Sequence, residues 1–179
     1  MIFRKRSVVA ATLDLGSHDS IQAWSDSVIR HVQDGDPLHG LVHHAGAMGL
    51  GVYTESSDGE EMQWATNYSG PFRLTQCLWA PLLQHNARVL CLTSSSHCTP
   101  NNPLDFTALP GSSIGSPDLR YNGWTAYQQS QLASILFARQ LNKEFVASGS
   151  GALSVAVAES DKWFYNPKLL LEEDKEVQE

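Results

Sequence analysis

A tyrosine and a glutamine stand one helical turn apart near position 130 of this 179-residue chain, in the run Tyr127-Gln-Gln-Ser-Gln131. The run lies in a segment whose apolar residues recur at helical spacing, so both side chains are expected on one helix face. A tyrosine hydroxyl titrates near ~10 and exchanges protons efficiently at neutral pH only when a nearby charge shifts it. Gln131 carries no charge. The spacing alone does not separate proton-transfer chemistry at Tyr127 from ordinary packing of a helix tyrosine, and Gln131 supplies no charge that would activate the hydroxyl.

A serine-rich turn supplies a second group of reactive side chains. Ser94 follows the short apolar run Val89 to Leu92, which is typical of a buried strand. A hydrolase nucleophile is disfavoured because the turn has no Gly-x-Ser-x-Gly elbow. His97 and Cys98 come next, but no third residue is evident that would orient them as a catalytic dyad.

Two adjacent histidines, His43 and His44, end another apolar run. Neighbouring residues of a strand point to opposite faces, so the pair cannot chelate one ion from an extended strand. Compatible Cys or Asp spacing is also missing nearby. We therefore predict no metal site.

The elements that must position these side chains alternate between strand and helix, which predicts an α/β fold with a parallel sheet. Ser17 is a good N-cap, and Gly70 and Pro71 predict an irregularity in a long helix. The expected elements are a helix over 17–32, a strand at 41–42, a long helix over about 58–84, a strand at 89–92, a loop over 100–123, a helix over about 124–145 and a strand over 152–158.

Taken in chain order, these motifs resemble the short-chain dehydrogenase/reductase family. Thr12-Leu13-Asp14-Leu15 resembles the family's third strand, and Leu38 to Gly46 resembles its fourth strand, with His43-His44-Ala45-Gly46 in place of Asn-Asn-Ala-Gly. Asn67-Tyr-Ser-Gly70-Pro-Phe72 resembles the helix that follows. Arg88 to His97 resembles the fifth strand with its catalytic serine, and Tyr127 to Ala133 the active-site helix. The resemblance covers roughly residues 8 to 158. Gln131 stands where the family has its lysine.

The resemblance implies roles for individual residues. The catalytic positions are Asn67, Ser94, Tyr127 and Gln131, with Ser95 as the alternative serine if the register shifts by one. The cofactor-binding positions that the resemblance implies are Asp14, Leu15, His44, Ala45 and Gly46. The implied reaction is hydride transfer between NAD or NADP and a small-molecule alcohol or carbonyl substrate.

The segment between serine and tyrosine narrows the resemblance. It contains Leu104-Asp105-Phe106, an insertion like that of retinol dehydrogenases and of the WW-domain-containing oxidoreductase. The run from Ser130 to Leu141 also matches that branch, apart from the lysine.

Two parts of the family pattern have no counterpart in the sequence. No Gly-x-x-x-Gly-x-Gly turn occurs, and the family's His-Pro-Gly and lid helix do not follow Ala158. We expect an incomplete Rossmann-type doubly wound parallel sheet that lacks the first strand-helix-strand unit and the substrate lid. Residues 1–158 form the partial domain and 159–179 a divergent segment with an acidic tail. We expect the third strand, Val8 to Leu13, to move beside the fourth rather than pair with another chain.

Composition limits the partners. A net charge of −7 and a pI near 5.4 argue against nucleic acid. No apolar stretch is long enough for a transmembrane segment, and three cysteines, an odd number, favour reduced thiols in the cytoplasm.

Two classes of function remain open. The first is a short-chain dehydrogenase/reductase-like oxidoreductase that is catalytically impaired. The alternative is a non-catalytic interaction protein or truncated isoform that retains the helices carrying Asn67 and Tyr127, through which the family commonly forms homodimers.

Overall fold

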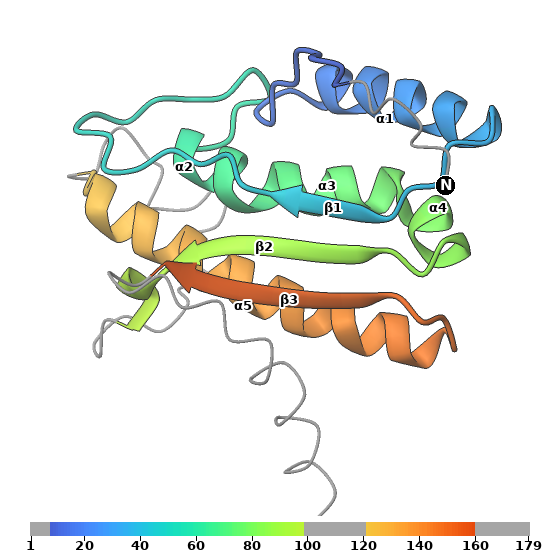
Figure 1. Ribbon diagram of the computed structural model, residues 1–179. Helices are drawn as coiled ribbons and strands as arrows, with labels where there is room; N and C mark the ends of the chain where they lie inside the picture. The colour runs from blue at the N-terminus through green and yellow to red at the C-terminus, as the bar shows by residue number, and fades with distance from the viewer. Residues whose placement is uncertain (1–7, 99–120, 160–179) are drawn as a thin grey trace, which may run out of the picture.

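Three parallel strands form the sheet of the computed structural model, which describes residues 8–98 and 121–159. The strands β1 (Gly40–His43), β2 (Arg88–Ser94) and β3 (Leu153–Glu159) lie in the order β1-β2-β3 (Figure 1). Val42, Leu90 and Val155 are partners across one row of the sheet. The α/β fold class with a parallel sheet is confirmed.

The first and last helices match the sequence pattern closely. Helix α1 (His18–Gln33) begins where the Ser17 hydroxyl accepts a hydrogen bond from the Ser20 amide at 3.3 Å. Helix α5 (Gly123–Ala147) begins at Asn122, whose side-chain oxygen accepts from the amides of Trp124 and Thr125, each at 3.0 Å.

The long helix expected over 58–84 is wrong as a single element. It is divided into α2 (Met62–Trp64), a wide π-helical turn (Ala65–Ser69), α3 (Gly70–Cys77) and α4 (Trp79–Gln84). The break lies where an irregularity was predicted. Proline lacks an N–H and its ring crowds the preceding turn, and the Gly70 amide bonds to the carbonyl five residues back, at Ala65.

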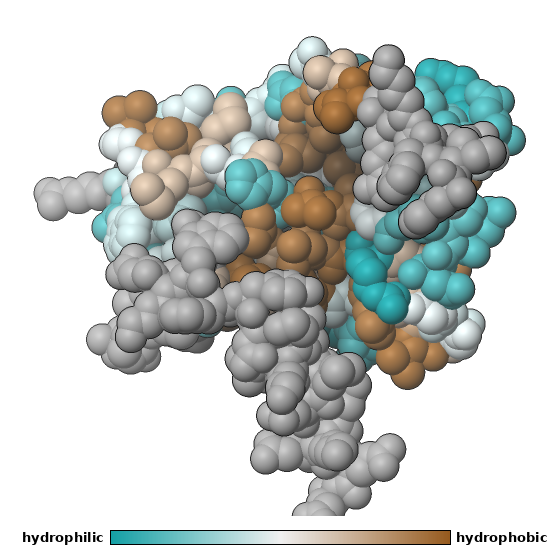
Figure 2. Space-filling view, in the orientation of Figure 1, coloured by the Kyte–Doolittle hydropathy of each residue, from teal (hydrophilic) through white to brown (hydrophobic). Residues whose placement is uncertain are grey.

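Helices α3 and α5 cover one face of the sheet, and α1 packs against α3 (Figure 1). In Figure 1, α3 and α5 lie behind the strands and α1 lies beyond β1. The core is on that side, where buried residues of β1, β2, α3, α4 and α5 meet: Leu41, Val89, Leu74, Leu82, Leu141 and Phe145. The opposite face, which we call the open face, carries apolar side chains that remain accessible: Val42, Leu153 and Val157 are 58%, 46% and 42% exposed (Figure 2). The doubly wound arrangement is therefore incomplete within residues 8–98 and 121–159.

The predicted strand at Val8 to Leu13 is wrong. Residues 8–13 have no regular structure, and Val8 and Val9 are 97% and 77% exposed. Among the described residues, β1 pairs only with β2. Strand β1 offers only four residues of ladder, and no helix of the described residues lies above its open face (Figure 1), so a strand added there would gain few hydrogen bonds and little burial.

Candidate active site

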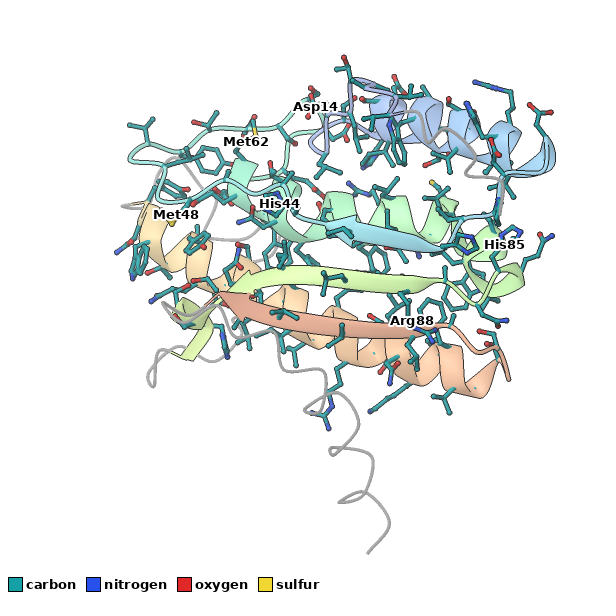
Figure 3. All side chains as sticks on the ribbon, viewed as in Figure 1. Asp14, His44, Met48, Met62, His85 and Arg88 are labelled. Atoms are coloured by element: carbon teal, nitrogen blue, oxygen red, sulfur yellow. The ribbon has the colours of Figure 1, made fainter. Side chains whose placement is uncertain are left out.

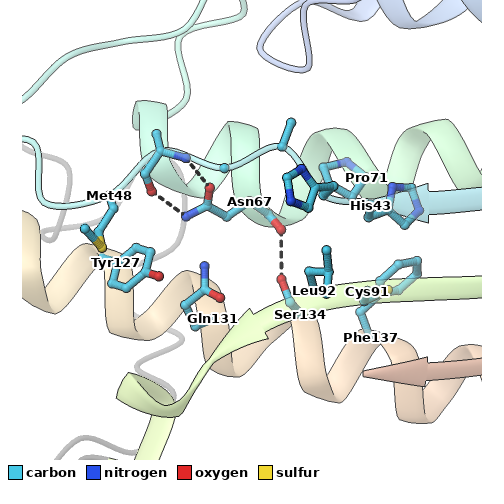
Figure 4. A pocket seen from close by; sticks show the side chains of 14 residues that line it. His43, Met48, Asn67, Pro71, Cys91, Leu92, Tyr127, Gln131, Ser134 and Phe137 are labelled. Atoms are coloured by element: carbon cyan, nitrogen blue, oxygen red, sulfur yellow. Dashed lines mark hydrogen bonds between the residues drawn. The ribbon is translucent and has the colours of Figure 1, made fainter. Parts of the chain in front are cut away.

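The π-helical turn fixes Asn67 between β1 and α5. Its side-chain nitrogen donates to the Ala47 carbonyl at 2.9 Å, and its side-chain oxygen accepts from the Ala47 amide at 2.8 Å (Figure 4). The same nitrogen donates to the Ser130 hydroxyl at 2.8 Å. A Cβ at Gly46 would lie 3.1 Å from that oxygen, so glycine allows this close approach. Asn67 thus holds the segment after β1 against the start of α5.

The backbone carbonyl of Asn67 also has a side-chain partner. In a regular α-helix it would accept from residue 71, but Pro71 has no N–H. The Ser134 hydroxyl, from α5, donates to this carbonyl at 2.8 Å. The contact ties the irregular turn to the helix that carries Tyr127.

His43 packs in the same layer as a neutral side chain. The Thr75 hydroxyl donates to the Pro71 carbonyl at 2.9 Å, so it accepts from His43 Nε2–H at 2.8 Å. This assigns the proton of the neutral ring to Nε2. Burial lowers the pKa of His43 to about 4, because removal from water disfavours the charged ring.

Tyr127 and Gln131 line a partly enclosed cavity of about 150 Å³ (Figure 4). Its lining comes from the end of β1 and the segment that follows it, the π-helical turn and α3, β2 and α5: His43, His44, Ala45, Gly46, Ala47, Met48, Asn67, Pro71, Cys91, Leu92, Tyr127, Gln131, Ser134 and Phe137. Six of the residues that the resemblance implicates therefore meet here: Asn67, Tyr127, Gln131, His44, Ala45 and Gly46. Burial raises the pKa of the lining thiol Cys91 to about 12, so this thiol is protonated at neutral pH.

Ser94 does not join this group. It is the last residue of β2, where its hydroxyl accepts from the Ser96 amide at 3.3 Å, and its carbonyl contacts His97 Nδ1 at 2.6 Å. The described lining contains neither Ser94 nor Ser95. The preceding Thr93 points beneath α5, where its hydroxyl donates to the Gln131 carbonyl at 3.1 Å.

Asp14 and Leu15 also lie away from the cavity. The Asp14 carboxylate accepts from the Gly16 amide at 2.8 Å, and the Ser20 hydroxyl lies 2.9 Å from the Asp14 amide nitrogen. Figure 3 shows Asp14 beside the start of α1, apart from His44 and Met48. The Leu15 carbonyl packs against Gly70, where a Cβ would clash with it. In this arrangement the pair shapes the entry to α1.

One polar cluster was missed by the sequence analysis. Gln63, fully buried, donates to the Tyr121 hydroxyl and to the Gly123 carbonyl, each at 2.8 Å, and accepts from the Gly49 amide at 2.7 Å. Tyr121 in turn donates to Glu61 at 2.6 Å, and burial together with that carboxylate raises the pKa of Tyr121. The cluster joins the segment after β1 to the first turn of α5. A lone glutamine in a helical pattern gives no sequence signal for such a role.

Within residues 8–98 and 121–159, no group of three His, Cys, Asp or Glu side chains is placed to hold a metal ion. In the same part of the chain, no helix is long and apolar enough to cross a membrane.

Known proteins resemble this chain in sequence and fold. No family model matches it. Retinol dehydrogenase 12 of Bos taurus is 34% identical over 155 residues, which is 86% of this chain and 45% of that protein. The short-chain dehydrogenase/reductase drtF of Aspergillus calidoustus is 36% identical over 123 residues, 63% of this chain and 37% of that protein.

A solved structure shows the same fold. The 3-alpha-hydroxysteroid dehydrogenase of Pseudomonas sp. B-0831, complexed with NADH, superposes with a TM-score of 0.62 at 21% identity, over 82% of this chain and 56% of that one. The chain spans about half the length of the curated relatives it matches. With the order of its motifs and the parallel sheet that carries them, this chain belongs to the short-chain dehydrogenase/reductase family, of whose retinol dehydrogenase members it covers a part.

Proposed function

We propose that this chain is an oxidoreductase-like domain whose alcohol or carbonyl chemistry with NAD or NADP is impaired. The observation that carries the proposal is the pairing of Tyr127 with Gln131 in one cavity. Gln131 occupies the position where the family resemblance implies a lysine, and a neutral amide supplies no charge to activate a phenol. The lining of the cavity does not include Ser94, which is consistent with an impaired site.

The described residues fit a whole dinucleotide poorly. The cavity, at about 150 Å³, accommodates a group the size of one six-membered ring. Asp14 and Leu15, the pair that the resemblance implies for the adenine end, lie at the start of α1 and do not line it. The sequence also has no Gly-x-x-x-Gly-x-Gly turn for a pyrophosphate. Hence we assign no chemical step to a bound nicotinamide cofactor.

Steady-state turnover tests this proposal. The purified 179-residue chain should not oxidise retinol or steroid alcohols measurably with NAD or NADP. The variant Gln131→Lys should also be inactive, because it restores a charge but leaves Ser94 outside the cavity. Bovine retinol dehydrogenase 12 is the assay control. Turnover by the unmodified chain would refute the impairment, and turnover by the variant alone would show that the lysine is the only deficit.

A second candidate function is non-catalytic assembly, as a homodimer. A concave surface of about 420 Å³ lies between α3, α4 and α5 and is lined largely by apolar side chains, among them Phe72, Trp79, Phe137 and Leu141. Phe72 is 36% exposed there. Surfaces of this kind favour association when a second copy covers them.

Sedimentation velocity tests the assembly. Phe72→Arg should turn a dimer into a monomer, whereas Val146→Arg, on an exposed position of α5 that does not line the concave surface, should not. A circular dichroism melt checks that both variants fold. A chain that is monomeric at every concentration would exclude the homodimer.

Cytoplasmic localisation is a further part of the proposal, supported by the free thiols of Cys77 and Cys91.

A further inference from the structure

The start of α5 carries the only Asn-Gly pair in the sequence, Asn122-Gly123. Glycine has no Cβ to shield its backbone nitrogen, and it leaves the chain free to rotate. That nitrogen can attack the side-chain carbonyl carbon of the preceding asparagine and expel ammonia, so an asparagine before glycine is the one most prone to lose its amide. Asn122 is exposed, and water therefore reaches its side chain.

Packing of the segment after β1 on α5 requires the glycine. A Cβ at position 123 would clash with the Leu50 carbonyl oxygen, and any other residue there would have to displace this backbone. The residue before it is less constrained, because serine, threonine or aspartate also caps a helix. The fold thus keeps the reactive neighbour of Asn122 in place.

Hydrogen bonding leaves the attacking nitrogen of Gly123 available. As the first residue of α5, Gly123 has no carbonyl one turn earlier in the helix, and its amide donates to none of the described residues. Two Asp-Gly pairs, which could react through the same ring, differ in this respect. The Gly35 amide donates to the Val32 carbonyl at 3.1 Å. The Gly59 amide donates to the Ser56 carbonyl at 3.0 Å.

The helix cap controls when the nitrogen can reach its target. The Asn122 side-chain oxygen is held by the amides of Trp124 and Thr125, and its backbone is extended, with ψ 99°. This ψ turns the Gly123 nitrogen away from the side-chain carbon. Ring closure therefore requires the first turn of α5 to open, and helix ends open at a lower free-energy cost than the core.

We propose that Asn122 is a site of spontaneous deamidation, gated by opening of the first turn of α5. The Gly123 nitrogen loses its proton and bonds to the side-chain carbonyl carbon of Asn122, and the side-chain nitrogen leaves as ammonia. Water then opens the five-membered imide ring. Attack of water at the side-chain carbonyl yields aspartate in a normal main chain. Attack at the main-chain carbonyl yields isoaspartate, in which the main chain runs through Cβ.

The two products act differently on the contacts around position 122. The Gln63 side-chain nitrogen donates to the Tyr121 hydroxyl and to the Gly123 carbonyl, each at 2.8 Å, so its two partners flank the modified residue. Aspartate preserves their spacing, and its carboxylate caps the helix at the positive end of the helix dipole. Isoaspartate lengthens the main chain by a carbon, which separates the two partners and removes the cap. Reaction in the folded chain therefore favours aspartate.

Peptide mass spectrometry of the full chain, incubated at neutral pH and physiological temperature, tests the proposal. The peptide that holds Asn122 should gain the mass difference between an amide and an acid. Asn86, which precedes alanine, and Asn142, which precedes lysine, should keep their amides. Equal conversion of either would overturn the proposal. So would an intact Asn122 amide in the native chain after the time in which the same chain converts fully in urea.

Variants at position 122 identify the residue and its product. Asn122→Ser keeps a capping oxygen but has no amide, so the mass gain should disappear. Asn122→Asp reproduces one product and should unfold at a urea midpoint no lower than that of the unmodified chain. Isoaspartate, measured by enzymatic methylation of its free carboxylate, should form a smaller share of the product in the native chain than in urea. An equal share would refute the effect of the fold on the product.

A further pair of variants tests the gating. Gln63→Met removes both hydrogen bonds that flank position 122 and should speed the conversion of Asn122 about tenfold. Gln140→Met, at an exposed position of the same helix, should not change the rate. An unchanged rate in Gln63→Met would show that the first turn does not gate the reaction. The chemistry involves neither the cavity at Tyr127 nor a cofactor, so it is independent of the proposed oxidoreductase function.

Discussion

His43 couples the stability of the chain to pH. Its ring is buried against Thr75 with the proton on Nε2, and burial lowers its pKa from 6.5 to about 4. The folded form therefore binds its proton less readily than the unfolded form. Stability is fully present above pH 6.5, falls as the pH drops from about 6.5 to about 4, and levels off below that. A shift of this size is worth about 3 kcal/mol at most.

The variant His43→Asn should remove most of this dependence. Asparagine does not titrate in this pH range, so the contribution of the imidazole to the pH dependence is lost even though the shorter side chain does not reproduce the contact of Nε2 with Thr75. Urea unfolding at a series of pH values between 4 and 7 measures the effect. The control is His39→Asn, whose side chain is exposed and whose substitution should leave the slope unchanged. An equal slope in the unmodified chain and in His43→Asn would assign the dependence to other groups.

At the scale of elements, the π-helical turn and α5 depend on each other. The Ser134 hydroxyl bonds to the carbonyl of Asn67, which Pro71 cannot reach with an N–H. The Asn67 side chain in turn bonds to Ser130 on the same helix. The helix that carries Tyr127 and Gln131 is thus positioned by the irregular turn as well as by apolar packing.

Removing the Ser134 hydroxyl should destabilise the chain by about 1–3 kcal/mol, because a buried carbonyl loses a partner. Urea unfolding of Ser134→Ala measures this. The exposed Ser148, which also donates to a carbonyl of α5, is the matched control and should cost less than about 0.5 kcal/mol on change to alanine. In a Pro71→Ala background, residue 71 regains an N–H, so the cost of Ser134→Ala should shrink. An undiminished cost would show that the hydroxyl acts elsewhere.

The sequence pattern predicted those helices and strands that depend on signals within a few residues, such as a helix cap or an apolar run. The Ser17 cap, the apolar run at Val89 and the periodicity after Trp124 each act within a few residues, and the structure has α1, β2 and α5 there. The candidate site was predicted in part, since Asn67, Tyr127 and Gln131 share a cavity.

The failures concern long-range pairing. The segment at Val8 has an apolar pattern, but whether it becomes a strand depends on a partner and a covered face, which its own residues do not encode. The role of Ser94 stays a prediction: it ends β2 and does not line the cavity. The hydrogen bonds of Gln63 span positions distant in sequence, and no periodic pattern marks them.

For the whole molecule, we expect the open face to govern self-association in solution. Parallel sheets are ordinarily covered on both faces, but here Val42, Leu153 and Val157 remain accessible opposite the helices. The edges of β1 and β3 are unpaired among the described residues. We therefore expect marginal stability and self-association that increases with concentration.

A lysine introduced on the open face or on the core face of β1 distinguishes an effect on self-association from an effect on folding. Val42→Lys should reduce self-association in sedimentation velocity and change stability little, because position 42 is 58% exposed. Leu41→Lys, one residue earlier, should unfold the chain, because Leu41 is buried in the core. A sharp melt that does not depend on concentration, from a monodisperse monomer of the unmodified chain, would contradict this account.

The burial of Asn67 has a consequence for covalent modification. Asn67-Tyr68-Ser69 matches the acceptor sequence for N-linked glycosylation, which modifies the asparagine side-chain nitrogen. In the folded chain that nitrogen donates to Ala47 and Ser130, and the residue is only 7% exposed. A glycan could be attached there only before the chain folds, and its bulk would then keep the π-helical turn from packing on α5. Asn67 therefore reports folding history: a chain that carries sugar at this residue has not reached the structure described above.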